Sequence, residues 1–367
     1  MHATESPVPA VSQQESPVYV RLSLAAAMTL GFTRGWFFRN ARLGCINLLL
    51  TYSGGCRANC AFCGLASEKR AGTRPRSFIR VPWKTYHTET VIDAVRSAPA
   101  HVHRVCISMV THPKCREDVI NLCGQISKRT TMDISLLVSP SVLHPGDLKR
   151  MKAAGAERIG VAIDAATPLL FEQLRGRTVH GPHSWDRYWN CYAESLDVFG
   201  KGMAGVHLIC GLGETEKEMV MAMYQARSMG GYTHLFSFFP EKHSAMENVS
   251  PPALSHYRRI QLARWVIDQD LTHPKAMEFD NRERIRDFGI SETSLQKIVW
   301  SGEPFRTSGC PGKDGAVACN RPYGNEKPGD NIRNFPFQPE KNDLEKVWQD
   351  LFDYSGPDHD CKGGNGK

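Results

Sequence analysis

The sequence predicts an α/β fold in which a parallel sheet forms a barrel or partial barrel. Two observations predict it: six short apolar segments alternate with helix-like segments after about residue 46, and a run of three cysteines directly follows the first of them. Apolar strands separated by helices are typical of parallel sheets with helical crossovers. In such barrels, functional residues collect at the carboxyl ends of the strands. A doubly wound open sheet is the competing architecture.

The strand candidates are all short and apolar, and a helix candidate precedes each one after the first. We expect strands at residues 46–52, 105–110, 133–139, 159–164, 206–212 and 235–239. We expect helices at 85–97, 116–129, 145–154, 185–199 and 214–229, with two later helices at 252–268 and 343–354.

Composition along the chain divides it into five parts. The expected parts are a disordered lead (1–20), an N-terminal extension (21–45), the barrel (46–250), a C-terminal extension (251–355) and a tail (356–367). The C-terminal extension contains a stretch, 301–339, that is rich in Gly, Pro, Asn and Arg. Such a stretch makes a poor core but is typical of an ordered, functional loop region.

Charge and cysteine usage exclude several classes of function. The 367-residue chain has a formal net charge of +7 and 12 cysteines. Its basic residues are scattered, which indicates a solvated surface and no nucleic-acid partner. No apolar run reaches about 18 residues, so we expect no membrane span. Cysteines without a secretory signal indicate a reducing compartment, and we expect a cytoplasmic protein.

Three cysteines, Cys56, Cys60 and Cys63, have the spacing C-x3-C-x2-C on one short loop. Three such thiolates can hold three irons of a 4Fe–4S cluster. Because no fourth cysteine lies nearby, the fourth iron would stay open and could bind a small chelating molecule. Zinc is the alternative, but structural zinc sites usually have four ligands, often arranged as two pairs.

This motif, with Phe62 just before the last cysteine, resembles that of the radical S-adenosylmethionine (radical SAM) superfamily. The resemblance implies a partial (β/α)6 barrel with N-terminal and C-terminal extensions. It also implies that the methionine moiety of S-adenosylmethionine chelates the open iron. Cleavage of the sulfonium by an electron from the cluster would release a 5′-deoxyadenosyl radical. Phe62 would pack near the adenine, or simply anchor the loop.

Other cofactor-binding residues follow from the same resemblance. Gly211, Gly213 and Glu214 end the fifth strand and resemble the superfamily's segment beside the adenine, although a plain strand-to-helix turn would look the same. Asp164 ends the fourth strand and matches an aspartate that binds the ribose hydroxyls in the biotin synthase branch. Its alternative role is a helix cap.

The methionine moiety would need its own partners. Arg175 or Arg177 could pair with the methionine carboxylate in bidentate fashion, and the sequence does not choose between them. Many family members have a Gly-Gly-Glu-like segment at the end of the second strand to hold the methionine amine. This chain lacks it, and Ser108 with backbone carbonyls would substitute.

A second metal site is expected from separated segments. Cys310 and Cys319 lie in the loop-rich stretch 301–339, and Cys45 precedes the first strand. Three thiolates from these segments could hold an auxiliary 4Fe–4S cluster. Cys361 is expected to be a bystander in the tail. The remaining cysteines suit structural packing: Cys106, Cys115, Cys123, Cys191 and Cys210.

Cys106 is a special case, because biotin synthase has a cluster ligand at a similar place on its second strand. That family also needs cysteines on the third and fifth strands. Here Leu136 and Leu137 lie on the third strand, and Gly205 stands near the start of the fifth. This departure argues against biotin synthase proper.

The sequence from residue 21 through the three-cysteine loop resembles that of one component of the two-component lipoyl synthase. The segment 306–323 resembles that component as well. That resemblance implies sulfur insertion into an unactivated C–H bond of an octanoyl chain on a protein lysine, with the auxiliary cluster as sulfur donor. It implies Ser308 as a labile fourth ligand of that cluster. This component would act second, at the carbon nearer the carbonyl.

The implied partners are an octanoylated lipoyl-carrier protein, the second lipoyl synthase component and a low-potential electron donor such as ferredoxin or flavodoxin. Two alternatives stay open. One is a biotin-synthase-like or other radical SAM enzyme with a different substrate. The other is an iron–sulfur or zinc protein without such chemistry, such as an electron carrier or scaffold.

Overall fold

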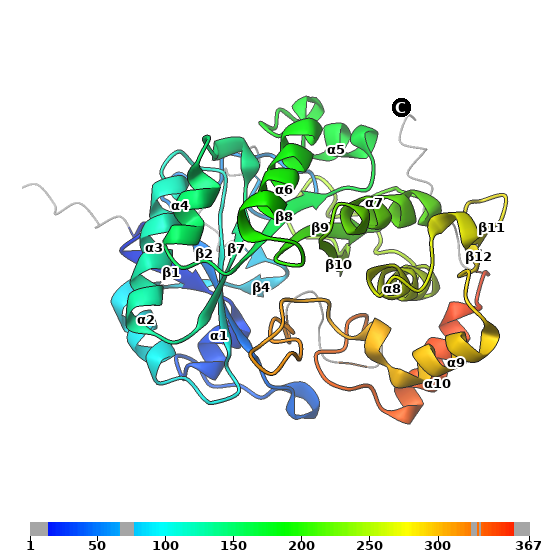
Figure 1. Cartoon of the computed structure of the whole chain (residues 1–367). Helices are drawn as coiled ribbons and strands as arrows, with labels where there is room; N and C mark the ends of the chain where they lie inside the picture. Colours follow the sequence, from blue (N-terminus) through cyan, green and yellow to red (C-terminus); the bar gives the residue numbers. More distant parts are fainter. Residues whose placement is uncertain (1–13, 67–76, 324–328, 330–331, 356–367) are drawn as a thin grey trace, which may run out of the picture.

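The computed structural model describes residues 14–66, 77–323, 329 and 332–355, and it centres on an eight-stranded sheet (Figure 1). Six neighbouring strands of this sheet are parallel and follow one another in chain order. They are β2 (Cys45–Leu50), β6 (Arg104–Ser108), β7 (Asp133–Val138), β8 (Arg158–Asp164), β9 (Ala204–Cys210) and β10 (Tyr232–Ser237). A doubly wound sheet would reverse its strand order partway. The consecutive order is that of the predicted partial (β/α)6 barrel, which is confirmed.

Two further strands extend the sheet beyond β2 in antiparallel fashion. β1 (Tyr19–Leu22) pairs with β2 and with β5 (Lys84–His87). Val20 and Leu22 alternate with less buried neighbours, so one face of β1 packs on the core. The sequence placed residues 19 and 20 in the disordered lead and began a helix at 85, and both boundaries are wrong. The rest of the predicted lead (1–13) and the tail 356–367 lie outside the described residues.

Helices follow each parallel strand and cover the outer face of the sheet (Figure 1). Those of the barrel are α2 (Thr88–Arg96), α3 (Cys115–Arg129), α4 (Asp147–Ala153), α5 (Pro168–Leu174), α6 (Trp185–Phe199) and α7 (Glu216–Ser228). Shorter or later elements are α1 (Leu24–Thr29), α8 (Leu254–Asp268), α9 (Glu292–Ser301) and α10 (Lys341–Leu351), with the small strand pairs β3 (Ser77–Phe78) with β4 (Val81–Pro82) and β11 (Glu278–Phe279) with β12 (Ile285–Asp287). Apart from the first three residues of 85–97, the predicted helices agree with these to within about three residues.

Residues on the inner face of the barrel come from alternate positions of each strand. Asn47 of β2 lies opposite Cys106 of β6, which lies opposite Ser135 of β7. All three line one cavity, whereas their neighbours Ile46 and Val105 are fully buried in the core on the other face. The interior of the barrel therefore carries polar and sulfur-containing side chains at this level.

The C-terminal extension docks against the amino-terminal end of the barrel. The side chain of Asn320 accepts a hydrogen bond from the Gly44 backbone N–H at 3.2 Å and donates to the Arg42 carbonyl at 2.7 Å. Ser308 pairs with the backbone of Leu235 on β10. These contacts bring two distant cysteines, Cys310 and Cys319, to the start of β2.

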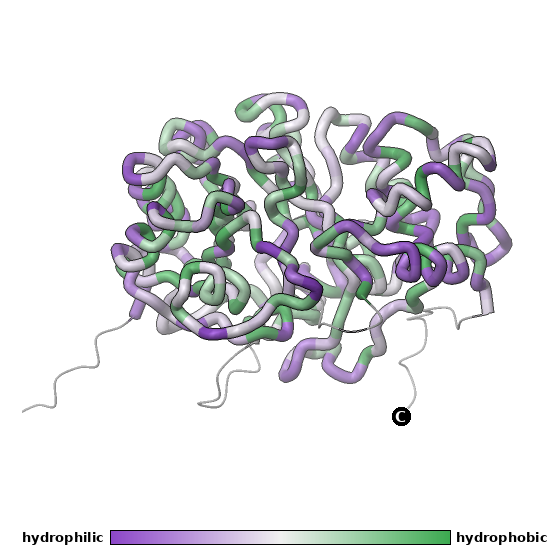
Figure 2. Tube along the Cα trace, turned by 90° about the horizontal axis from the view of Figure 1, so that it is seen from below, coloured by the Kyte–Doolittle hydropathy of each residue, from purple (hydrophilic) through white to green (hydrophobic). Residues whose placement is uncertain are grey.

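Hydropathy varies over short distances along the chain, and Figure 2 shows hydrophobic and hydrophilic stretches alternating through the helices. In the described part of the chain, no helix is both long enough and apolar enough to cross a membrane.

Gly44 tests the docking of the C-terminal extension. A Cβ at Gly44 would lie 2.7 Å from the Ala318 carbonyl oxygen, and backbone does not yield easily. We expect Gly44→Ala to destabilise the fold by about 1–3 kcal/mol through overpacking, measured by thermal unfolding. Gly54→Ala is the matched control, because a Cβ there meets no atom within 4 Å. Equal melting temperatures for the two variants would contradict this account of the docking.

Candidate active site

The loop that carries Cys56, Cys60 and Cys63 lies at the carboxyl end of β2 and is tied to neighbouring elements. The Arg57 N–H donates to the Thr111 carbonyl at 2.7 Å, and the Ala61 N–H donates to the Leu174 carbonyl at 2.8 Å. None of the three cysteines is in a disulfide, and all three line the barrel cavity. The loop is therefore held in place by contacts with the β6 and β8 sides of the barrel.

Two of the three sulfur atoms of this loop accept hydrogen bonds from backbone N–H groups. Cys56 Sγ accepts backbone N–H groups from Ala58 and Thr111, each at 3.4 Å, and Cys63 Sγ accepts from Leu65 at 3.4 Å. Burial raises the pKa of Cys63 well above its ordinary value, and burial also raises the pKa of Cys60. Buried thiols of this kind are stable as thiolates when a metal supplies positive charge. The donor set therefore fits three ligands of an iron–sulfur cluster.

The cavity has a volume of about 280 Å³ and extends from this loop to a second group of cysteines. Leu49, Leu137, Ile209 and Phe236 line the space between the two ends. Two sulfur-rich sites thus open on one largely apolar lumen.

Asp164 and Arg175 form a buried ion pair beside the first site. Asp164 Oδ2 lies 3.1 Å from Arg175 Nη1, and both side chains line the cavity. Arg175 also donates to the Ile163 carbonyl at 2.8 Å, and it contacts the carbonyl of Ala162. Burial raises the pKa of Asp164 against the opposing effect of Arg175. Burial alone would lower the pKa of Arg175, but Asp164, Tyr188 and Cys60 outweigh it and raise that pKa.

The backbone at Asp164 is strained. Its φ is +66°, and a register shift interrupts the pairing of β8 with β9 between Ala162 and Asp164. Bulges and left-handed non-glycine residues cluster at functional sites, where the surrounding structure holds them. Here the strain turns the carboxylate toward the cavity and toward Arg175, which is the placement that ribose binding would require.

The structure separates the two arginines between which the sequence did not choose. Arg175 is buried in the cavity wall, whereas the Arg177 side chain is 93% exposed and pairs with Glu172 at 3.6 Å. Arg177 therefore lies outside the cavity wall in this structure, and its role in cofactor binding stays a prediction. Ser108 and Phe62 both line the cavity, on the β6 side and on the cluster loop.

Gly211, Gly213 and Glu214 lie at the end of β9 but do not line the main cavity. The Glu214 carboxylate accepts the backbone N–H groups of Gly211 at 2.6 Å and Leu212 at 3.0 Å. Gly211 has a φ of +98°, and a Cβ there would lie 2.5 Å from Pro252. Glu214 thus holds this turn together through its backbone rather than reaching into the lumen.

The second group of cysteines forms where the C-terminal extension docks. Cys45, Cys310 and Cys319 pack together as a buried cluster, and Cys106 packs against it. The Asn47 amide lies 3.9 Å from Cys45 Sγ and 3.7 Å from Cys319 Sγ. Four thiols that meet in this way fit either an iron–sulfur cluster or a zinc ion.

The thiols of this group are unequal. Burial raises the pKa of Cys45 well above its ordinary value. A hydrogen bond from Cys45 lowers the pKa of Cys319 to about 6, with help from the positive charge of Arg321. The two thiols therefore differ in acidity, and Cys319 is the more acidic of the pair.

Ser308 does not offer a free hydroxyl to this group. Its Oγ accepts the Leu235 N–H at 2.7 Å and donates to the Leu235 carbonyl at 3.3 Å, which extends the edge of β10. In this structure Ser308 has a structural role, and its role as a cluster ligand stays a prediction. Cys106, which the sequence singles out as a special case, packs against the other three thiols. Cys106 and Ser108 share the strand parity that faces the lumen.

Two histidines also line the lumen near these thiols and were not predicted. His234 Nε2 lies 3.8 Å from Cys310 Sγ, and its ring is 5.0 Å from that of His207 on β9. Burial lowers the pKa of His234 to about 3 and lowers the pKa of His207 well below its ordinary value. Both imidazoles therefore favour the neutral form, and His234 Nε2 can accept a hydrogen bond from the Cys310 thiol.

Comparison with known proteins identifies the class. Residues 50–224 match the family model described as the radical SAM superfamily. The match begins at the end of β2 and includes the three-cysteine loop, Asp164, Arg175 and the Gly211 turn. This part of the chain is a radical SAM domain. The family implies a 4Fe–4S cluster and S-adenosylmethionine as cofactors, and the loop described above fits three ligands of that cluster.

The curated relatives that match are biotin synthases at low identity. The one from Cereibacter sphaeroides is 24% identical over 179 residues, covering 47% of this chain and 49% of the relative. The one from Albidiferax ferrireducens is 21% identical over 236 residues, covering 62% and 61%. The chain thus spans about half the length of the first of these relatives. The part-length match supports the superfamily and leaves the substrate to be argued.

Two solved structures match parts of the chain at low identity. Streptococcus suis SuiB has a TM-score of 0.41 at 12% identity, covering 59% of this chain and 45% of that one. Coproporphyrinogen III oxidase (HemN) from Escherichia coli, described as a radical SAM enzyme, has a TM-score of 0.34 at 13% identity, covering 54% and 46%.

The two arginines provide a matched test of the first site. We expect Arg175→Gln to weaken S-adenosylmethionine binding at least about tenfold, because it leaves the buried Asp164 carboxylate without its partner. Arg177→Gln should bind as tightly as the wild type, since Arg177 is exposed. Binding is measured by equilibrium dialysis on anaerobically reconstituted protein, with iron content as a check on folding. Equal affinities in both variants would remove Arg175 from the site.

Proposed function

We propose that this protein is a sulfur-inserting radical SAM enzyme that acts on an octanoyl chain carried on a protein lysine. It would be one of two components that together make the lipoyl group. The observation that carries the proposal is the pair of sulfur-rich sites at the two ends of one lumen. One set of thiols suits the generation of a radical, and the other suits the storage of sulfur.

Sulfur insertion into a C–H bond requires one site that generates a radical and another that supplies sulfur. When bound, the cluster and S-adenosylmethionine supply a radical able to remove hydrogen from an unactivated C–H bond, which no acid–base group of the chain can do. The second set of thiols would hold an iron–sulfur cluster that acts as the sulfur-donating substrate. Cys45, Cys310 and Cys319 are its proposed ligands, with Cys106 in place of Ser308 as the fourth.

The lumen also suits an alkyl substrate. Leu49, Leu137, Ile209 and Phe236 line the space between the two sets of thiols. An octanoyl chain has no charge and no hydrogen-bonding group along its methylenes, so it would bind to such walls through burial of apolar surface. These side chains would hold the reacting carbon between the two sites and exclude water from it.

The proposal includes three partners. They are an octanoylated lipoyl-carrier protein, the other lipoyl synthase component and a low-potential electron donor such as ferredoxin or flavodoxin. We propose further that this component acts second, at the carbon nearer the carbonyl. These parts of the proposal rest on the resemblance of the sequence around the two sets of thiols to one component of the two-component lipoyl synthase.

A biotin-synthase-like enzyme is the second candidate, favoured by the curated relatives. Cys106 on β6 suits it as well. The third and fifth parallel strands, however, present Ser135 and His207 to the lumen where that family needs cysteines. Turnover of a substrate that is not attached to a carrier protein would favour this alternative.

A turnover experiment tests the proposed reaction. The reconstituted enzyme is incubated with reductant, S-adenosylmethionine and an octanoyl-lysine peptide from a lipoyl carrier, alone and with its partner component. We expect a peptide whose mass has risen by sulfur, detected by mass spectrometry. Release of 5′-deoxyadenosine with an unchanged peptide would refute lipoyl synthesis and keep the radical SAM assignment.

The fourth ligand of the second site has its own test. Iron counting on the reconstituted wild type should give about eight irons per chain, as two 4Fe–4S clusters require. We expect Cys106→Ser to fall toward about four irons, because one thiolate is lost from the second set. Ser308→Ala should retain about eight, since its hydroxyl is bound to Leu235. The opposite pattern would restore Ser308 as the ligand, and zinc in place of iron would refute the sulfur-donor role.

A further inference from the structure

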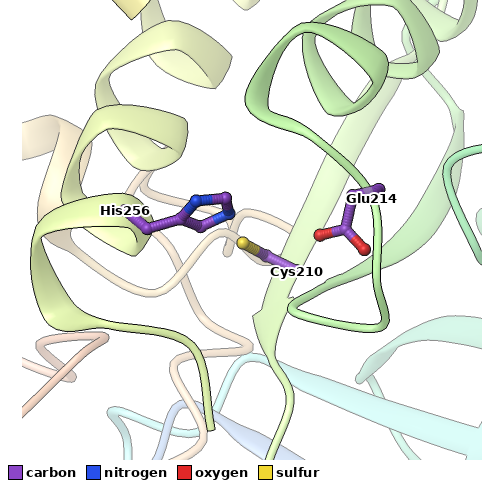
Figure 3. A group of neighbouring side chains, drawn as sticks. All are labelled: Cys210, Glu214 and His256. Carbon is purple, nitrogen blue, oxygen red and sulfur yellow. The ribbon is translucent and has the colours of Figure 1, made fainter. Parts of the chain in front are cut away.

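A second group of metal-binding side chains lies outside the barrel lumen. Cys210 ends β9, Glu214 lies in the turn before α7, and His256 lies in the first turn of α8 (Figure 3). Their donor atoms, one from each residue, all lie within 4.8 Å of one another. Cys210 and Glu214 are buried, and none of the three lines the main cavity. Three segments that are separate in the chain therefore converge on one point.

The imidazole of His256 is oriented by a second carboxylate. His256 Nδ1 lies 3.3 Å from Glu216 Oε1, and Glu216 is fully buried. Arg259 holds that carboxylate through Nη2 at 2.7 Å and Nε at 2.9 Å, and the Ile285 N–H donates to it at 2.7 Å. A carboxylate with these partners stays ionised, so it takes the Nδ1 proton of His256 as a hydrogen bond. The lone pair is left on Nε2.

This lone pair is without a partner in the described part of the chain. His256 Nε2 is buried and accepts no hydrogen bond, and Figure 3 shows the ring beside Cys210. Buried polar atoms are rarely left unsatisfied, and each exception calls for an explanation. A histidine that donates one ring N–H to a carboxylate and presents the other nitrogen is the usual form of a metal ligand.

We propose that Cys210 Sγ, a Glu214 carboxylate oxygen and His256 Nε2 bind a single Zn²⁺ ion. Thiolate, imidazole and carboxylate are the ligand types that zinc takes, and three protein ligands leave one position for water. Zinc bonds of about 2.0–2.3 Å set tetrahedral ligands about 3.5 Å apart, so donor atoms that lie within 4.8 Å of one another need to close by about 1.3 Å at most. The edge of His256, whose side chain is 15% exposed, gives the ion a path from solvent.

The ion would fasten the turn after β9 to α8. Glu214 already holds the backbone of Gly211 and Leu212, and it would now also be joined to His256 through the metal. The dication would balance the thiolate of Cys210 and the carboxylate of Glu214. This site is independent of the sulfur-insertion proposal, since it shares no residue with either set of thiols in the lumen.

The test uses the full-length protein with its iron–sulfur clusters reconstituted first, so that the lumen thiols are occupied. The protein is equilibrated with Zn²⁺, desalted and measured by mass spectrometry of its metals. We expect about one zinc per chain, with X-ray absorption showing one sulfur and three nitrogen or oxygen ligands. Cys210→Ser and His256→Gln should each weaken zinc binding at least tenfold, and Glu216→Gln about tenfold.

Cys191→Ser is the matched control, because Cys191 is a buried cysteine on α6 outside every group described, and it should bind zinc as the wild type does. Three outcomes would overturn the proposal. The first is that no zinc is retained. The second is a zinc ion with three or more sulfur ligands, which would locate it at the lumen thiols. The third is unchanged binding in Cys210→Ser, which would leave Cys210 as a hydrogen-bond donor to Glu214.

Discussion

Every second residue of a parallel strand must face the inside of the barrel, and this constraint decides which side chains are available for chemistry. Asn47, Cys106 and Ser135 lie side by side because their strands pair in that register. Leu49, Ser108 and Leu137 form the next level toward the carboxyl ends. The lumen is therefore graded, from sulfur and polar groups at its base, through an apolar middle, to the cluster loop at its mouth.

The base of the lumen is completed by a segment from far along the chain. Asn320 bonds to the backbone at Arg42 and Gly44, and Ser308 adds to the edge of β10. Both contacts satisfy backbone groups that would otherwise lie unpaired at the rim of the sheet. The contacts that dock the C-terminal extension on the barrel therefore also bring Cys310 and Cys319 to Cys45.

Much of this arrangement could be predicted from the sequence. Short apolar segments that alternate with helix-like segments indicate the sheet. Three cysteines in eight residues define a local site that can be recognised without knowledge of the tertiary structure. The convergence of Cys45, Cys310 and Cys319 was also predicted, from loop composition and resemblance. The exact strand ends and the β1–β5 pairing were not, because an edge strand is defined by its partner more than by its own pattern.

Other features of the site could not be predicted from the sequence, for physical reasons. Arg175 and Arg177 are the same residue type two positions apart, and only the turn after α5 decides that one is buried against Asp164 while the other is exposed. Ser308 has a hydroxyl that could bind a metal, but in this structure that hydroxyl is hydrogen-bonded to the backbone of Leu235 on β10. His256 carries no sequence signal at all, since its partners Cys210 and Glu214 are found only once α8 packs on the end of β9.

The two sets of thiols differ in how much of the chain each one needs. Cys56, Cys60 and Cys63 are present together as soon as one short loop has been synthesised. Cys45 and Cys319 come from opposite ends of the protein, and in the folded chain both are almost wholly buried. It follows that the two sets of thiols form at different stages. The first set is complete once its loop has been made, whereas the second set is brought together only when the C-terminal extension docks on the barrel.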